Sequence, residues 1–313
     1  AGAAVTGNKI VASTKGNSSA STIDIQNVEG APTFAGSAVV SNTQLGTNAP
    51  ASATNVNGSV RATVTGLLGI SELGGSLAVS GNSISSATIG NEALGSGTNP
   101  VGNQILLADG LSFAGPGGSI APPGATLNGY ADGTAVNADL VISNLQRNTS
   151  VAGSVMGSST INGAVEASVE SLVNGAVALS DNTITSSATG NAARSALASG
   201  TNAASFSGSA ALANQQDNIT VGVTAINAGS SIEATAGSVQ NSSVSVADNR
   251  SSASARGNEV GQSLSLDATT LTLGGTVDLS SQANGLLQAN GMATVSNRQV
   301  NTGTAVSASN IAS

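Results

Sequence analysis

One phrase of this sequence recurs four times along the chain. It reads "VTGNKIVASTKGNSS" from Val5, "VSGNSISSATIGNEA" from Val79, "LSDNTITSSATGNAA" from Leu179 and "VADNRSSASARGNEV" from Val246. The two asparagines of each copy are nine residues apart: Asn8 and Asn17, Asn82 and Asn91, Asn182 and Asn191, Asn249 and Asn258. A pattern that returns at fixed internal spacing indicates repeated structural units that stack on one another.

A second phrase follows each copy of the first. It reads "GSAVVSNTQ", "ADLVISNLQ", "GSAALANQQ" and "GMATVSNRQ", and a Gln stands two residues after each of Asn42, Asn144, Asn214 and Asn297. Between the phrases lie "TFAGS", "SFAGP", "SFSGS" and "TLGGT". All the phenylalanines of the chain, Phe34, Phe113 and Phe206, therefore share one repeat position, and we expect Leu273 to be its fourth member.

The chain thus divides into four tandem units of one repeat domain, residues 1–313. The units span approximately residues 1–74, 75–174, 175–241 and 242–313. Their lengths differ through insertions at one point, approximately residues 114–137 in unit 2 and 276–290 in unit 4. Insertions at one repeated position predict loops on one face of the array.

Small and β-branched side chains alternate with period 2 within the first phrase, and no helical period is visible. We therefore predict an all-β fold, a β-solenoid whose rungs stack about 4.8 Å apart. Because aromatic residues are only 1% of the chain, the core must be narrow and built from Ala, Val, Ile and Leu. The asparagines are expected at corners, bonding turn backbone or stacking on the next rung; a sugar- or ion-binding ladder is the alternative.

Two further expectations concern geometry. A unit of about 70 residues must contain at least two rungs, so the equivalent phenylalanines should point inward but lie on the order of 10 Å or more apart, too far to stack. The strands "VRAT", "VEAS" and "IEAT" put Arg61, Glu166 and Glu233 at one repeat position. These three side chains should face solvent on the same side of the coil.

Composition excludes several classes of function. The net charge is −8 and the eight Lys and Arg residues are scattered, so there is no basic stripe to bind nucleic acid. The chain has no His and no Cys, which removes imidazole metal sites and Ser-His-Asp or Cys-His catalysis. The closest carboxylate pairs of any interest, Glu166 with Glu170 and Asp132 with Asp139, are expected to be solvated surface groups. We predict no catalytic, cofactor or metal residue, and expect that the chain is not an enzyme; a solenoid polysaccharide lyase or hydrolase is a third class to test.

Asn, Gly-Asn-x-Ala and Gln at fixed places in a chain without Cys resemble the extracellular fibre and anchor proteins of bacteria, such as curli subunits and holdfast anchors. The units here are longer and less equal than those of curli. "SATIGNEALGSGTN" is also similar to the head repeats of trimeric autotransporter adhesins, whose period is shorter. The resemblance implies an extracellular, cell-surface protein whose partners are further copies of itself, an outer-membrane secretion channel or a surface polysaccharide.

The expected function is a structural subunit of a secreted bacterial filament that assembles head to tail for adhesion or biofilm matrix. The alternative is a monomeric or trimeric adhesin that binds glycan or another surface through its insertion loops. The fourth unit has no "VRAT"-type strand after Asn297, and the first unit opens directly in the first phrase. We expect unpaired strand edges at both ends, joined between copies by many backbone hydrogen bonds and few salt bridges.

Overall fold

Every regular element in the described part of the chain is a β-strand. The computed structural model describes residues 2–26, 33–48, 50–65, 67–68, 75–95, 101–115, 134–201, 203–274, 277–281, 288–291, 293–303 and 305–311. None of these segments forms a helix that could cross a membrane.

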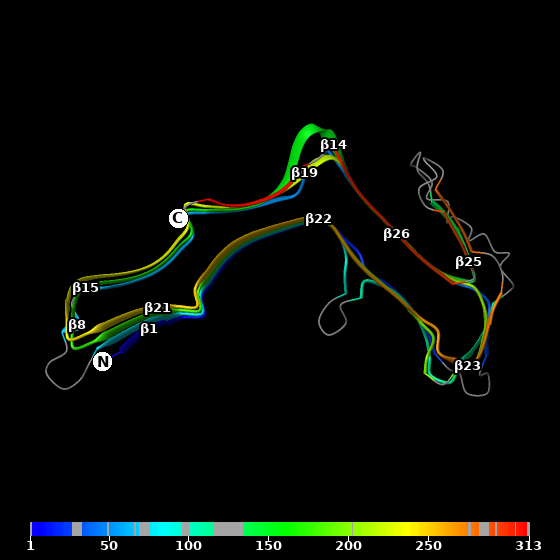
Figure 1. Cartoon of the computed structure of the whole chain (residues 1–313), viewed down its shortest axis with the longest axis horizontal. Coiled ribbons are helices and arrows are strands. Elements are labelled where there is room, and N and C mark those ends of the chain that lie inside the picture. The colour runs from blue at the N-terminus through cyan, green and yellow to red at the C-terminus, as the bar shows by residue number, and fades with distance from the viewer. Residues whose placement is uncertain are drawn as a thin grey trace.

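Each unit makes one complete turn of the coil. Gly2 of unit 1 pairs with Ser76 of unit 2. Ser76 pairs in turn with Ala176 of unit 3, which pairs with Ser243 of unit 4. Figure 1 looks along the stack, and the equivalent strands of the four units overlie one another in a long cross-section that is bent in the middle. The β-solenoid is confirmed, but the expectation of two rungs per unit is wrong.

The turn has two walls that run side by side. The first wall is built from strands at the start of each unit: β1 (Gly2–Thr6), β9 (Ser76–Ser80), β16 (Ala176–Ser180) and β21 (Ser243–Ala247), then β2 (Lys9–Ser18), β10 (Ser83–Ala93), β17 (Thr183–Ala198) and β22 (Arg250–Ser265), with β3 (Ser21–Ile25) and β11 (Asn103–Leu107). The second wall comprises β5 (Ala38–Thr47), β14 (Leu140–Ile161), β19 (Ala210–Ala228) and β26 (Ala293–Thr302), with β6 (Ser52–Val56) and β27 (Val306–Ile311). Pairing within both walls is parallel and in register from unit to unit, apart from one shift in β14 between Thr149 and Ser154.

Further strands close each turn of the coil at the two ends of its long cross-section. At one end lie β4 (Thr33–Ala35), β12 (Ser112–Ala114), β18 (Ala203–Gly208) and β23 (Ala268–Leu273). At the other end lie β7 (Ser59–Val64), β8 (Leu67–Leu68), β15 (Ala164–Val173) and β20 (Ser231–Gln240). Sharp turns between strands use left-handed backbone, at Gly7 and Gly81 in units 1 and 2 and at Asp181 and Asp248 in units 3 and 4. These residue types adopt that conformation most readily.

The two insertions meet outside the coil. β13 (Thr134–Asn137), from the unit 2 insertion, pairs antiparallel with β24 (Val277–Ser281) of unit 4, which pairs antiparallel with β25 (Gln288–Gly291). Both β13 and β24 contact β19 of the second wall. Residues 116–133 and 282–287, which make up most of the predicted loops, lie outside the described residues.

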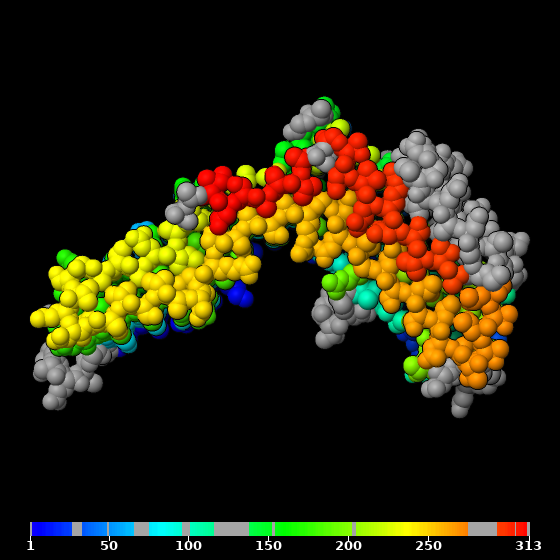
Figure 2. All heavy atoms as spheres, in the orientation of Figure 1, coloured from blue at the N-terminus to red at the C-terminus, as the bar shows by residue number. Residues whose placement is uncertain are grey.

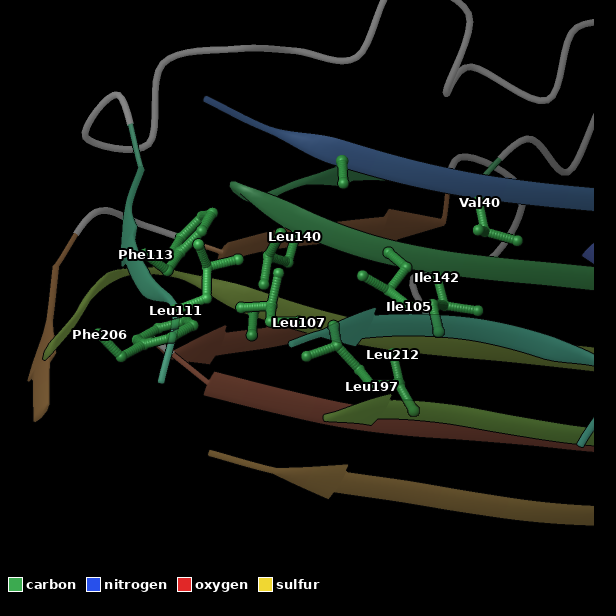
Figure 3. Close-up of a cluster of buried hydrophobic side chains, with 12 residues drawn as sticks. Val40, Ile105, Leu107, Leu111, Phe113, Leu140, Ile142, Leu197, Phe206 and Leu212 are labelled. Atoms are coloured by element: carbon green, nitrogen blue, oxygen red, sulfur yellow. The ribbon is translucent and has the colours of Figure 1, made fainter. Parts of the chain in front are cut away.

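The three phenylalanines stack at one end of the coil. The ring centroids of Phe34 and Phe113 are 5.9 Å apart, and those of Phe113 and Phe206 are 4.9 Å apart. The expected separation of about 10 Å is wrong because one unit makes one rung, so equivalent residues are one strand spacing apart. The inward orientation is confirmed, since Phe113 and Phe206 are buried and Phe34 is half-buried. Figure 3 shows Phe113 and Phe206 beside Leu111, in a cluster that draws on both walls.

The fourth member of the phenylalanine column is Leu271, not Leu273. Phe206 pairs with Leu271, whereas Leu273 pairs with Gly208. Leu273 still packs against the same cluster as a partly buried residue. Matching "TFAGS" to "TLGGT" shifts the alignment by two residues, which leaves a side chain on the same face of a strand.

A second apolar cluster fills the other end of the coil. It contains Leu77, Ile84, Val165, Leu172 and Leu179, all buried. On the outside of this end, Arg61, Glu166 and Glu233 occupy one register position and share one face, as predicted. The Arg61 Nε lies 2.7 Å from Glu166 Oε2, a surface ion pair that contributes about 0–1 kcal/mol.

Replacing Phe113 with Ala should lower the free energy of unfolding by about 3–5 kcal/mol, because the ring is fully buried and stacks on both sides. Leu271→Ala, at the same register position but 48% exposed, is the matched control and should cost less than about 1 kcal/mol. Urea denaturation followed by circular dichroism measures both. Equal losses would show that the phenylalanine column does not support the core.

Candidate functional site

The most regular feature of the interior is a set of asparagine columns that run along the stack. In the first column the side-chain amide of Asn8 donates to Asn82 Oδ1 (3.0 Å), Asn82 donates to Asn182 (3.0 Å), and Asn182 donates to Asn249 (2.9 Å). The backbone N–H groups of the first three donate to the same oxygens. This column lies at the corner between β1 and β2 and their equivalents, as predicted, and stacks amide on amide.

Two further columns stand inside the coil, between the walls. One links Asn17, Asn91, Asn191 and Asn258 at 2.7–2.8 Å. The other links Asn42, Asn144, Asn214 and Asn297 at 2.7–3.0 Å. These residues lie within strands such as β10 and β14, so the expectation that they occupy corners is wrong. The stacking of each amide on its neighbour in the next rung is confirmed.

The glutamines two residues after the second-phrase asparagines form a further column. In it the hydrogen bonds run the other way, because each amide donates to the glutamine of the preceding unit. The Nε2 of Gln146 donates to Gln44 Oε1 (2.7 Å), Gln216 donates to Gln146 (2.8 Å), and Gln299 donates to Gln216 (3.0 Å). Each glutamine of the first three units also donates across the coil to a carbonyl of the first wall, as Gln146 does to Ala192 (2.9 Å). Residues two apart share a strand face, which explains the fixed Asn-x-Gln spacing.

A fourth asparagine column, which the repeat phrases do not single out, ties the two walls together. Asn148 donates to Asn218 (2.9 Å), which donates to Asn301 (2.8 Å). Asn148 also donates to Asn191 across the coil, and Asn218 to Asn258, both at 3.0 Å. The sequence does carry a signal for this column, because each of these residues stands four after a second-phrase asparagine. In unit 1 this position is Gly46, which breaks the column.

In units 1 to 3, the glycine before the second asparagine of the first phrase is required by close packing along the stack. A Cβ on Gly16, Gly90 or Gly190 would lie less than 3.0 Å from the carbonyl oxygen of the equivalent glycine in the next unit. The asparagine side chains of the opposite wall crowd the same positions at Gly90 and Gly190. Only glycine allows the two walls to approach closely enough for the amides to bond across the coil.

A buried ionic cluster lies on the outer side of the second wall. Arg147 and Arg298 donate to the two carboxylate oxygens of Asp217 at 2.7 and 2.8 Å, and Gln215 also donates to it. The Asp217 side chain is 1% exposed. Motif spacing does not predict this cluster, because its charges come from three units, which the register aligns only after folding.

The carboxylates expected at the surface behave differently from one another. Asp139 is buried and accepts hydrogen bonds from the backbone and hydroxyl of Ser209 (2.8 and 3.0 Å), so the expectation that it is solvated is wrong. Burial follows from its position at the turn into β14. Glu166 and Glu170 are partly or fully exposed, as predicted, and Asp132 lies outside the described residues.

The two end faces of the stack have different surfaces. Unit 4 presents residues whose equivalents in unit 3 are buried: Val246 is 55% exposed and its register partner Leu179 is 0% exposed. Likewise Val295 is 50% exposed and Leu212 is 0% exposed. Figure 2 shows this face, with unit 4 in orange and red toward the viewer. At the unit 1 face, Gly46 leaves a hollow of about 240 Å³ whose lining includes Asn148 and Met156.

Substituting Gly190 with Ala should lower the free energy of unfolding by about 1–3 kcal/mol, because the new methyl group would clash with the Gly257 carbonyl. Gly274→Ala is the control: a Cβ there meets no atom within 4 Å, so no measurable loss is expected. Thermal unfolding compares the two variants. A stable Gly190→Ala protein would contradict the close approach of the strands.

Replacing Asn191 with Leu should cost about 1–3 kcal/mol for each buried amide that it leaves without a partner. Asn191 accepts hydrogen bonds from Asn91 and Asn148 and donates to Asn258. Ser187→Leu places the same side chain on the exposed face of the same strand and should change stability by less than about 0.5 kcal/mol. Denaturant titration distinguishes the columns from a merely apolar interior, in which Asn191→Leu would stabilise.

The side-chain amides of these columns take part in hydrogen bonds within the protein. Within the described residues, no group of three or more His, Cys, Asp or Glu side chains is placed to hold a metal ion. The amides are occupied by one another and by backbone carbonyls, which leaves the two end faces as the places where the pattern is open. Comparison with protein families, with curated proteins and with solved structures finds no match for this chain.

Proposed function

We propose that this chain is a structural subunit that polymerises head to tail, the unit 1 face of one copy on the unit 4 face of the next, to build an extracellular filament for adhesion or biofilm matrix. The proposal is carried by one observation: the hydrogen-bonding pattern of the stack has a direction, and its two ends are complementary.

The asparagine columns supply this direction. In each of the three four-membered columns, Nδ2 of one unit donates to Oδ1 of the following unit. At unit 4 the columns therefore end in the donors Asn249, Asn258 and Asn297. At unit 1 they begin with the acceptors Asn8, Asn17 and Asn42. The glutamine column runs the other way, so that Gln299 offers an acceptor and Gln44 a donor.

Unit 4 and unit 1 of two copies therefore match at the three four-membered asparagine columns and at the glutamine column, whereas two identical faces would oppose donor to donor and acceptor to acceptor. The backbone follows the same rule. Gly7, Gly81 and Asp181 each donate to a carbonyl of the following unit. In a stack of copies, Asp248 continues this series to the next molecule. Strand pairing between copies is then parallel, as it is between units.

Apolar burial favours the same contact. Val246 and Val295 extend columns that are buried in units 2 and 3. Covering them with a second copy removes apolar surface from water, at about 25 cal/mol per Å². Bare strand edges together with exposed core residues are a template for pairing with another chain.

An interface between two different faces that does not close on itself generates an open filament. The proposed place at the bacterial cell surface rests on the likeness of the repeat phrases to bacterial fibre and anchor proteins. A chain without cysteine, with a net charge of −8 and few charged residues is compatible with that setting.

Purified protein at micromolar concentration should form unbranched filaments of constant width in negative-stain electron microscopy. Val246→Lys should leave the subunit folded but abolish the filaments, because it places a charge on the unit 4 face where a second copy must pack. The control is Val155→Lys: Val155 is 49% exposed, lies in unit 2 and is away from both end faces. This variant should polymerise normally.

A wild-type protein that stays monomeric under these conditions contradicts the proposal and favours the adhesin alternative. Filaments that form equally well from Val246→Lys would place the contact on another surface. Sedimentation of the same samples measures the fraction assembled.

A further inference from the structure

Four charged residues of the first wall lie in two columns of the stack. In the register of β2, β10, β17 and β22, one column contains Lys15, Ile89, Thr189 and Arg256. The other column contains Ser18, Glu92, Ala192 and Glu259. The charges thus stand in units 1, 2 and 4, and unit 3 is neutral at both positions.

Two ion pairs show how these columns interact. Lys15 of unit 1 reaches across one strand spacing to Glu92 of unit 2, and the hydroxyl of Ser18 donates to the same carboxylate (3.1 Å). In unit 4, Arg256 Nη1 lies 2.8 Å from Glu259 Oε2. A lysine at the first position therefore reaches a carboxylate at the second position in a neighbouring rung.

The exposure of the two carboxylates differs because only one is covered. The Glu92 side chain, inside the stack, is 9% exposed. The Glu259 side chain, at the unit 4 face, is 43% exposed, and the Lys15 side chain, at the unit 1 face, is 54% exposed. In the head-to-tail contact, Lys15 of the next copy lies one rung from Glu259, just as it lies one rung from Glu92 on its other side.

We propose that Lys15 of one copy and Glu259 of the next form an ion pair across the assembly interface, and that this pair holds the first walls of the two copies in register. The proposal rests on the head-to-tail contact argued above. It adds the two residues whose ion pair favours that contact in this register. Lys15 then bridges two carboxylates, Glu92 of its own chain and Glu259 of its neighbour, and Ser18 lies between them.

The pair also balances like charges that the register brings together. Stacking places Lys15 next to Arg256, so two cations face two carboxylates in a neutral group of four. Elsewhere on the same wall the register places Lys9 of one copy next to Arg250 of the other, with no carboxylate at that position in either unit. Lys9 and Lys15 therefore have opposite expected effects on assembly, although both are lysines of β2.

Charge reversal tests the pair. Glu259→Lys places a third cation beside Lys15 and Arg256, and Lys15→Glu places a third carboxylate beside Glu92 and Glu259. Each variant alone should raise the critical concentration for polymerisation about tenfold or more, because like charges oppose each other in a buried contact. The Lys15 and Glu259 side chains are 54% and 43% exposed in the monomer, and circular dichroism and thermal unfolding test whether each variant folds.

An equimolar mixture of the two variants is the decisive sample. Where the unit 4 face of a Glu259→Lys copy meets the unit 1 face of a Lys15→Glu copy, the introduced lysine faces the introduced glutamate. The other contact of the mixture keeps the native Glu259 and Lys15. The mixture should polymerise at a critical concentration within about threefold of the wild type, as an alternating copolymer. Lys9→Glu changes the net charge as Lys15→Glu does, yet it should leave the critical concentration unchanged or lower it.

The outcomes separate the two proposals. A wild-type protein that does not polymerise overturns the assembly itself, and the ion pair with it. Normal polymerisation of wild type, Glu259→Lys and Lys15→Glu alike overturns the ion pair and leaves the head-to-tail contact standing. A mixture that assembles no better than its components, or a Lys9→Glu variant as impaired as Lys15→Glu, also overturns the ion pair, because the effect is then one of net charge.

Discussion

The in-register parallel pairing of one unit on the next is the interaction on which the rest of this structure depends. Because each unit completes one turn, every residue of a unit lies one strand spacing from its equivalents above and below. A single side chain repeated in sequence then becomes a continuous column in space. The phenylalanine stack, the amide columns and the crowded glycines are all consequences of this spacing.

Polar columns in the interior fix the strand register between units. An apolar interior tolerates a slip of two residues along a strand, since the same face still points inward. A column of amides does not, because every slipped amide loses its partners and stays buried. Apolar clusters at both ends of the coil supply the burial, and the amides between them supply the register. The chain therefore holds a long, thin cross-section together with very few aromatic residues.

The same pairing makes the first and last units of the stack different from the inner units. Inside the molecule each unit satisfies its neighbours, but the first and last units show the open pattern: acceptors at one face, donors at the other, and core residues half in water. The buried ionic cluster around Asp217 differs from the end faces, because its charges are compensated within the chain. Charges at the end faces are more exposed: the side chains of Lys15 and Glu259 are 54% and 43% exposed.

Much of this arrangement was readable from the sequence. The four units, the equivalence of Asn8, Asn82, Asn182 and Asn249, the shared position of the phenylalanines and the common face of Arg61, Glu166 and Glu233 all follow from spacing alone, because local repetition maps directly onto parallel register. The number of rungs per unit does not follow, because it depends on how far the chain runs before it turns back. That distance is set by packing between walls, which decided that Phe113 stacks on Phe206, that Asn91 lies inside the coil and that Asp139 is buried. Repetition in the sequence thus identifies most of the equivalent residues, although it places Leu273 where the structure has Leu271. Which residues touch is a property of the fold, since contact across the coil depends on the path of the whole turn.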